Sequence, residues 1–154
     1  MRRAAILAVA AVLGLAGAAQ AQDYPHSAFG QAVADSRVAY IDAGVDAALT
    51  LTQIDTAQAP GCASAFLSYA EGAERSLEAI EDFVLLERMI VDPAARDALR
   101  AYFQTRAARA DSWITLSALP VQEACANAPS FQVDFERLDS RYRALLAVMQ
   151  GEAP

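Results

Sequence analysis

An apolar repeat in the C-terminal part of the chain constrains the fold more than any other feature of the sequence. Its members follow one another at alternating spacings of four and three residues and are Phe131, Phe135, Leu138, Tyr142, Leu145 and Met149. This spacing places all of them on one side of an α-helix, which must then pack against other helices. Ser130 is the expected N-cap, and Gly151 provides a stop. The sequence therefore predicts a long amphipathic helix between these two residues.

Three further stretches show helical spacing, and none shows the strict alternation of a half-buried strand. The first runs from about Ser27 to Gln58 and is broken by Pro60-Gly61. The second follows that break, and its apolar face is Phe66, Ala70, Ala73, Leu77, Ile80 and Val84. The third is expected to begin at Asp92-Pro93, a capping side chain followed by a proline, and to close at Pro120. Its predicted inward residues are Leu99, Tyr102 or Phe103, Ala110 and Trp113.

Four long helices joined mostly by short connections predict an all-α fold, specifically an up-down-up-down four-helix bundle. A three-helix bundle with a loosely docked first helix is the alternative. No internal repeat or low-complexity linker interrupts the stretch from residue 22 to residue 154, so we expect these residues to form a single helical domain.

Residues 1–21 have the form of a secretory signal peptide. Arg2-Arg3 precedes an apolar run over residues 4–17, and Ala19-Gln20-Ala21 supplies the small residues of a cleavage site. The run is shorter than the roughly 20 apolar residues that a membrane-spanning helix needs, so we expect cleavage near Ala21 and no stable membrane anchor. The predicted location is the periplasm or the outside of the cell.

The charge of the chain argues against a nucleic-acid partner. It carries 12 arginines, no lysine and 19 acidic residues, which gives a net charge of −7. Such a surface repels phosphate backbones. An acidic surface also keeps an exported protein soluble, and this explanation is simpler than a dedicated cationic partner.

The two cysteines, Cys62 and Cys125, are expected to form a disulfide bond, because an exported protein with an even number of cysteines meets an oxidising environment. In the predicted bundle, Cys62 opens the second helix and Cys125 lies between the third and the fourth, so both are at the same end. The chain has no Cys-x-x-Cys pair of the kind that thiol-redox enzymes use.

An acidic row follows the second helix at spacings of three and four residues: Glu71, Glu74, Glu78 and Glu81. Di-metal sites in helical bundles combine such carboxylates with Glu-x-x-His motifs, whereas the single histidine, His26, belongs to no such motif. We therefore expect a solvated rim of ion pairs, in which Glu78 faces Arg106 and Glu74 lies near Arg109.

Glycines at positions 44 and 72 interrupt two predicted helices, where each costs about 1 kcal/mol relative to alanine. A close crossing of the first two helices would explain them. The alternative is a pocket for an apolar ligand, lined by the small residues Ala43, Gly44, Ala47, Ala48, Ala70 and Ala73.

The segment from Phe83 to Val91 places apolar side chains around nearly the whole circumference of a helix. Either neighbouring helices bury it completely or part of it is a contact surface. Leu85 and Leu86 diverge by about 100°, so one of them is expected to be exposed. We predict that Leu85, with Val148 from the last helix, contributes to a patch for a protein partner or for self-association.

No nucleophile and base, metal constellation or phosphate-binding loop is recognisable in the sequence, so we predict neither an enzyme nor a cofactor. The expected function is macromolecular interaction, as an inhibitor, adaptor or chaperone-like factor. A bundle that binds a small apolar ligand in its core and an unrecognised enzyme with scattered carboxylates are the alternatives.

The segment 138–146, Leu-Asp-Ser-Arg-Tyr-Arg-Ala-Leu-Leu, resembles the Leu-Asn-x-x-Tyr-x-x-Leu stretch of a family of small secreted lysozyme inhibitors. The resemblance covers fewer than ten of the 154 residues. Members of that family carry clustered cysteines ahead of the stretch, where this chain has only Cys125 nearby. The resemblance therefore assigns no family.

Overall fold

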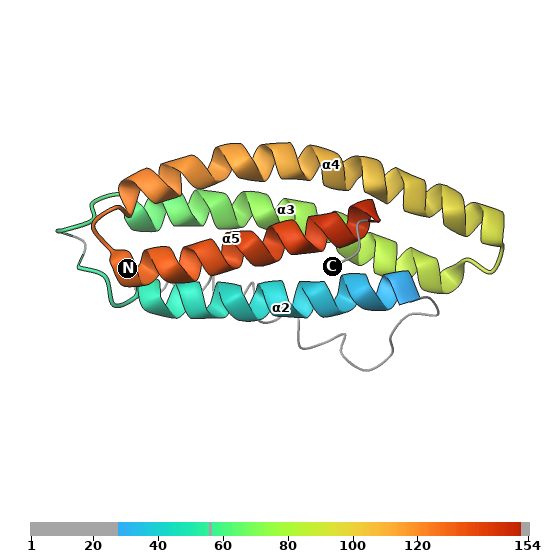
Figure 1. Ribbon diagram of the computed structural model, residues 1–154, viewed down its shortest axis with the longest axis horizontal. Coiled ribbons are helices and arrows are strands. Elements are labelled where there is room, and N and C mark those ends of the chain that lie inside the picture. The colour runs from blue at the N-terminus through green and yellow to red at the C-terminus, as the bar shows by residue number, and fades with distance from the viewer. Residues whose placement is uncertain (1–27, 56, 152–154) are drawn as a thin grey trace.

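The computed structural model describes residues 28–55 and 57–151, in which four helices lie side by side (Figure 1). They are α2 (Ala28–Leu51), α3 (Cys62–Met89), α4 (Pro93–Ala124) and α5 (Pro129–Gln150). These helices are the only regular elements of the described residues, which confirms the all-α prediction. The predicted signal peptide and His26 lie outside the described residues.

The first helix is shorter than expected because polar side chains compete for its backbone groups. α2 ends at Leu51, whereas the sequence predicted a helix to Gln58. The Thr52 hydroxyl donates to the carbonyl of Leu49 at 2.7 Å, and a carboxylate oxygen of Asp55 accepts from the amide of Ala57 at 2.9 Å. Such local bonds satisfy the backbone without a further helical turn.

The predicted start of α4 is confirmed and its predicted end is wrong. The Asp92 carboxylate caps the helix by accepting from the amide of Ala95 at 2.9 Å. The helix then continues through Pro120 to Ala124, so the proline lies within the helix. The buried side chains of Val121 and Cys125 hold this last turn on the core. α5 begins at Pro129, one residue before the predicted cap.

The helices pack in pairs of unequal extent. α2 packs chiefly on α5, and α3 packs chiefly on α4, while α2 and α3 touch only lightly. Polar groups reinforce the first pair, because Arg137 donates to the carboxylate of Asp46 at 2.9 Å and the Thr50 hydroxyl donates to Asp134. Exposed ion pairs of this kind contribute at most about 1 kcal/mol each, so apolar packing dominates the stability.

The predicted repeat of α5 lies at the centre of the core, where each of its six residues is at most 2% exposed. Aromatic side chains of the other helices meet it edge to face. The rings of Tyr40 and Tyr142 are 5.0 Å apart, and Tyr69 and Phe135 are 4.9 Å apart. Burial raises the pKa of Tyr142 to about 12 and that of the other two tyrosines further.

The inward face of α4 matches the prediction in part. Its buried residues are Phe103, Ala107, Ile114, Ala118 and Val121. Phe103 is one of the expected inward residues, and Leu99 and Ala110 are partly buried against the core, as predicted. Tyr102 and Trp113, by contrast, are 53% and 37% exposed and do not belong to this face. In α2, similarly, Leu49 is 54% exposed while Ala47 and Ala48 are buried.

An aromatic layer marks the level at which α2 begins and α5 ends. The ring of Phe83 in α3 lies 5.4 Å from Phe29 at the start of α2 and 4.9 Å from Phe103 in α4. At the same level, the Gln104 side chain donates to the carbonyl of Gln150, the last residue of α5. The hairpin of α3 and α4 therefore extends beyond the other two helices, as Figure 1 shows.

Candidate functional site

The end of the α3–α4 hairpin exposes an apolar surface. Four side chains form it, with exposed fractions of 46% for Leu85, 42% for Leu86, 77% for Met89 and 88% for Val91. We refer to these four residues as the apolar tip. They lie beyond the layer of Phe83, where α2 and α5 contribute no residues, so only two helices share the burial of apolar side chains.

The structure confirms the expected exposure of Leu85 and corrects two related predictions. Leu86 is exposed as well, so the two leucines do not divide into one buried and one exposed residue. Val148 is only 5% exposed and contributes nothing to a surface patch. α5 ends at the level of Gln104, short of the hairpin end, so Val148 cannot join Leu85 there.

Exposed acidic side chains flank the apolar tip along the chain. Asp82, Asp92 and Asp97 are exposed on its two helices and on the turn between them. Arg96 is turned inward instead, and its guanidinium donates to the carbonyl of Ile90 at 2.8 Å, where it holds the turn. The surface thus combines an apolar centre with a negative rim, which complements an apolar surface with a basic rim.

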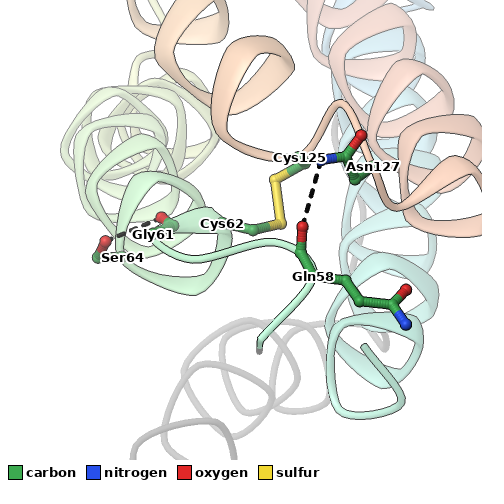
Figure 2. The surroundings of a disulfide bond; sticks show 6 residues. All are labelled: Gln58, Gly61, Cys62, Ser64, Cys125 and Asn127. Atoms are coloured by element: carbon green, nitrogen blue, oxygen red, sulfur yellow. Dashed lines mark hydrogen bonds between the residues drawn. A yellow bond between two sulfur atoms is a disulfide. The ribbon is translucent and has the colours of Figure 1, made fainter. Parts of the chain in front are cut away.

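The predicted disulfide joins Cys62 to Cys125 at the opposite end of the hairpin, with an S–S distance of 2.09 Å and a Cα–Cα distance of 4.8 Å. Cys62 is the first residue of α3, and Cys125 directly follows α4. Both are at most 1% exposed. Figure 2 shows that Asn127 also donates across this end to the carbonyl of Gln58, at 3.3 Å. These contacts have a structural role and leave the cysteines inaccessible.

The acidic row of α3 does not form the predicted ion pairs. Neither Glu78 with Arg106 nor Glu74 with Arg109 comes within ion-pair distance among the described residues. Glu74 is half-buried and adds to the rise in the pKa of Tyr40, which burial mainly causes. In the part of the chain that the structure describes, no three histidine, cysteine or carboxylate side chains are placed to hold a metal ion.

Gly72 permits a close approach, but the partner is α4 and not α2 as predicted. A Cβ atom on Gly72 would lie 1.9 Å from Cη2 and 2.0 Å from Cζ2 of Trp113. The indole therefore lies directly over the glycine. The light contact between α2 and α3 leaves the predicted tight crossing of those helices without support.

Beside this indole, a cleft of about 650 Å³ opens between α3 and α4. We call it the arginine cleft, and its lining residues are Gly72, Arg75, Ser76, Tyr102, Phe103, Thr105, Arg106, Ala107, Arg109, Ala110, Trp113, Leu146 and Met149. None of the small residues considered from the sequence as a pocket lining borders this cleft. The signal that the sequence reasoning missed is the spacing of four, three and four residues from Tyr102 through Arg106 and Arg109 to Trp113, which places them on one face of α4.

No protein-family model, characterised protein or solved structure matches the chain. None of the four described helices is both long enough and apolar enough to cross a membrane. The apolar tip and the arginine cleft are therefore the features from which a function can be inferred.

Proposed function

We propose that the protein is an exported, non-enzymatic binding protein that contacts another protein through the apolar tip. In this proposal a signal peptide over residues 1–21 is removed, and residues 22–154 form one domain with up-down-up-down helices. The periplasm or the outside of the cell is its location. The observation that carries the proposal is the extension of the α3–α4 hairpin beyond α2 and α5, which leaves the apolar tip uncovered.

The order of helices is supported by their backbone contacts. Within the described residues, the helix pairs whose backbones come close are α2 with α5, α3 with α4, α4 with α5 and α2 with α3. The two remaining pairs meet only through side chains, as Tyr69 of α3 does with Phe135 of α5. This is the arrangement of a square in which consecutive helices are neighbours.

The size of the apolar tip favours a groove on a different protein over a second copy of this chain. Four exposed side chains are too few to bury the roughly 800 Å² per partner of a standard interface. A projecting hairpin can instead insert its apolar end into a groove, where a few central side chains supply most of the binding energy. The rim of Asp82, Asp92 and Asp97 suits a groove bordered by basic residues.

Photo-crosslinking tests this proposal. A photoreactive phenylalanine analogue replaces Met89 in one variant and Val133, which is 60% exposed on α5, in the control. In the native cell, we expect a discrete crosslinked product from position 89 and none from position 133. Adding Leu85→Glu should abolish that product while changing the free energy of unfolding by no more than about 0.5 kcal/mol, because the side chain is exposed.

Three results would contradict the proposal. They are identical products from both positions, a product from position 89 that survives Leu85→Glu, and a product that proves to be a dimer of this chain. A large loss of thermal stability in the Leu85→Glu variant would show instead that Leu85 is part of the core.

A further inference from the structure

The arginine cleft has a floor made by the hydrophobic core. Phe103, Leu146 and Met149 lie at the bottom of the cleft and are each at most 2% exposed. The apolar surface that a ligand could cover therefore belongs mainly to Tyr102 and Trp113, which are 53% and 37% exposed. Trp113 forms part of the wall, where its indole lies over Gly72. Apolar atoms that leave water for such a surface gain roughly 25 cal/mol per Å².

The rim of the cleft is positively charged, although the chain as a whole is acidic. Arg75, Arg106 and Arg109 are all exposed there, in a protein with a net charge of −7. Arg137 differs from them, because Asp46 and Asp134 neutralise its charge. Among the described residues, the three rim arginines form no ion pair.

The contact of Arg106 with Tyr102 keeps the guanidinium of Arg106 at the rim. Arg106 donates to the hydroxyl of Tyr102 at 2.9 Å and lies 5.7 Å from the centre of that ring. A guanidinium carries five N–H donors, so most of them stay available to an anion. Planar guanidinium groups are well suited to bind a carboxylate through paired hydrogen bonds.

We propose that the arginine cleft binds a small amphipathic organic anion of the long-chain carboxylate class. The apolar chain would lie along Tyr102 and Trp113, above the buried floor. The carboxylate would meet Arg106 and Arg109 at the rim. The volume of about 650 Å³ is within the usual range of small-molecule sites, roughly 300–1,000 Å³. This site is independent of the apolar tip, since none of the tip residues lines the cleft.

Trp113 provides a direct measurement, because it is the only tryptophan of the chain. The probe is dodecanoate, used below its micelle concentration, and the readouts are tryptophan emission and isothermal titration calorimetry. We expect a saturable change in emission with one molecule bound per chain. Dodecyltrimethylammonium has the same chain with a cationic head, and acetate has the carboxylate without the chain, so neither should bind.

Two variants assign the binding to the cleft. Arg106→Gln combined with Arg109→Gln should weaken dodecanoate binding by about tenfold or more, since it removes the charged donors. The matched control is Arg141→Gln, an exposed arginine of α5 outside the cleft, which should leave the affinity unchanged. Circular dichroism confirms that each variant is folded.

The proposal is overturned if dodecanoate does not bind, or if the cationic amphiphile binds equally well. It is also overturned if the control variant weakens binding as much as the rim variants do, because binding would then reflect overall charge. Binding of acetate alone would contradict the role of the apolar surface.

Discussion

Loss of the disulfide between Cys62 and Cys125 should destabilise the protein by more than any single exposed contact could. The bridge joins residues 63 positions apart, and the chain-entropy model gives about 4 kcal/mol for a loop of that length. Truncating each buried cysteine to alanine removes a packed sulfur atom and costs about 1 kcal/mol more. We therefore expect losses of about 5 kcal/mol for either single variant and about 6 kcal/mol for the double variant.

The assay is urea denaturation of the wild type, Cys62→Ala, Cys125→Ala and the double variant, each with and without dithiothreitol. If the bridge exists, either single variant already breaks it, so the double variant falls far short of the sum of about 10 kcal/mol. The reductant should lower the stability of the wild type alone. A double variant that equals the sum of two small single effects, with no response of the wild type to reductant, would refute the bridge. Labelling of both cysteines by a thiol reagent in the unfolded, unreduced protein would refute it as well.

Two other predictions concern the core. Phe83→Ala should lower the free energy of unfolding by about 3–5 kcal/mol, because its fully buried ring holds the start of α2 against α4. In the same urea titration, the control Val133→Ala, at an exposed site, should change the free energy of unfolding by no more than about 0.5 kcal/mol. Burial raises the pKa of Tyr142 from its usual 10.0 to about 12, so the neutral hydroxyl stabilises the folded state fully below pH 10 and this stabilisation is lost as the pH rises through 12. Tyrosinate absorbance and circular dichroism should therefore change together in that range, and ionisation of the buried tyrosines in a protein that stays folded would contradict the assignment.

The sequence was most informative where one helix face is apolar and the other polar. All six members of the α5 repeat are buried, because a strict repeat leaves only one way to orient the helix. α4 has large apolar side chains on both sides, at Phe103 and Ile114 and also at Tyr102 and Trp113. Periodicity alone could not choose between Tyr102 and Phe103, and it wrongly assigned Trp113 to the side that faces the core.

Predicting the apolar tip in full required the relative positions of the helix ends, which the apolar pattern of a single helix does not give. Exposure of Leu85 followed from the angular spread of apolar residues on α3. Burial of Val148 depended on where α5 stops relative to α3, and therefore on the aromatic layer around Phe83 that aligns the helix ends. The sequence does not give this alignment, because the helices differ in length from 22 to 32 residues.

The arginine cleft could not be anticipated because it arises between helices. The four-three-four spacing from Tyr102 to Trp113 is visible in the sequence, but the open space beside it depends on the approach of α3. Gly72 illustrates the difficulty, since the cost of a glycine in a helix indicates a close neighbour without identifying it. The neighbour is an indole from a residue 41 positions further along the chain.

The disulfide and the turn at Ile90 to Asp92 make α3 and α4 a closed covalent ring, with α2 and α5 attached to it at adjacent points. A pulling force applied through α2 and α5 would pass across the sulfur atoms and would not stretch the chain between them. At about 3.5 Å per residue, the contour length released on unfolding would be roughly 220 Å shorter for the disulfide-bonded protein than for the reduced protein, because the 63 residues within the ring would not extend.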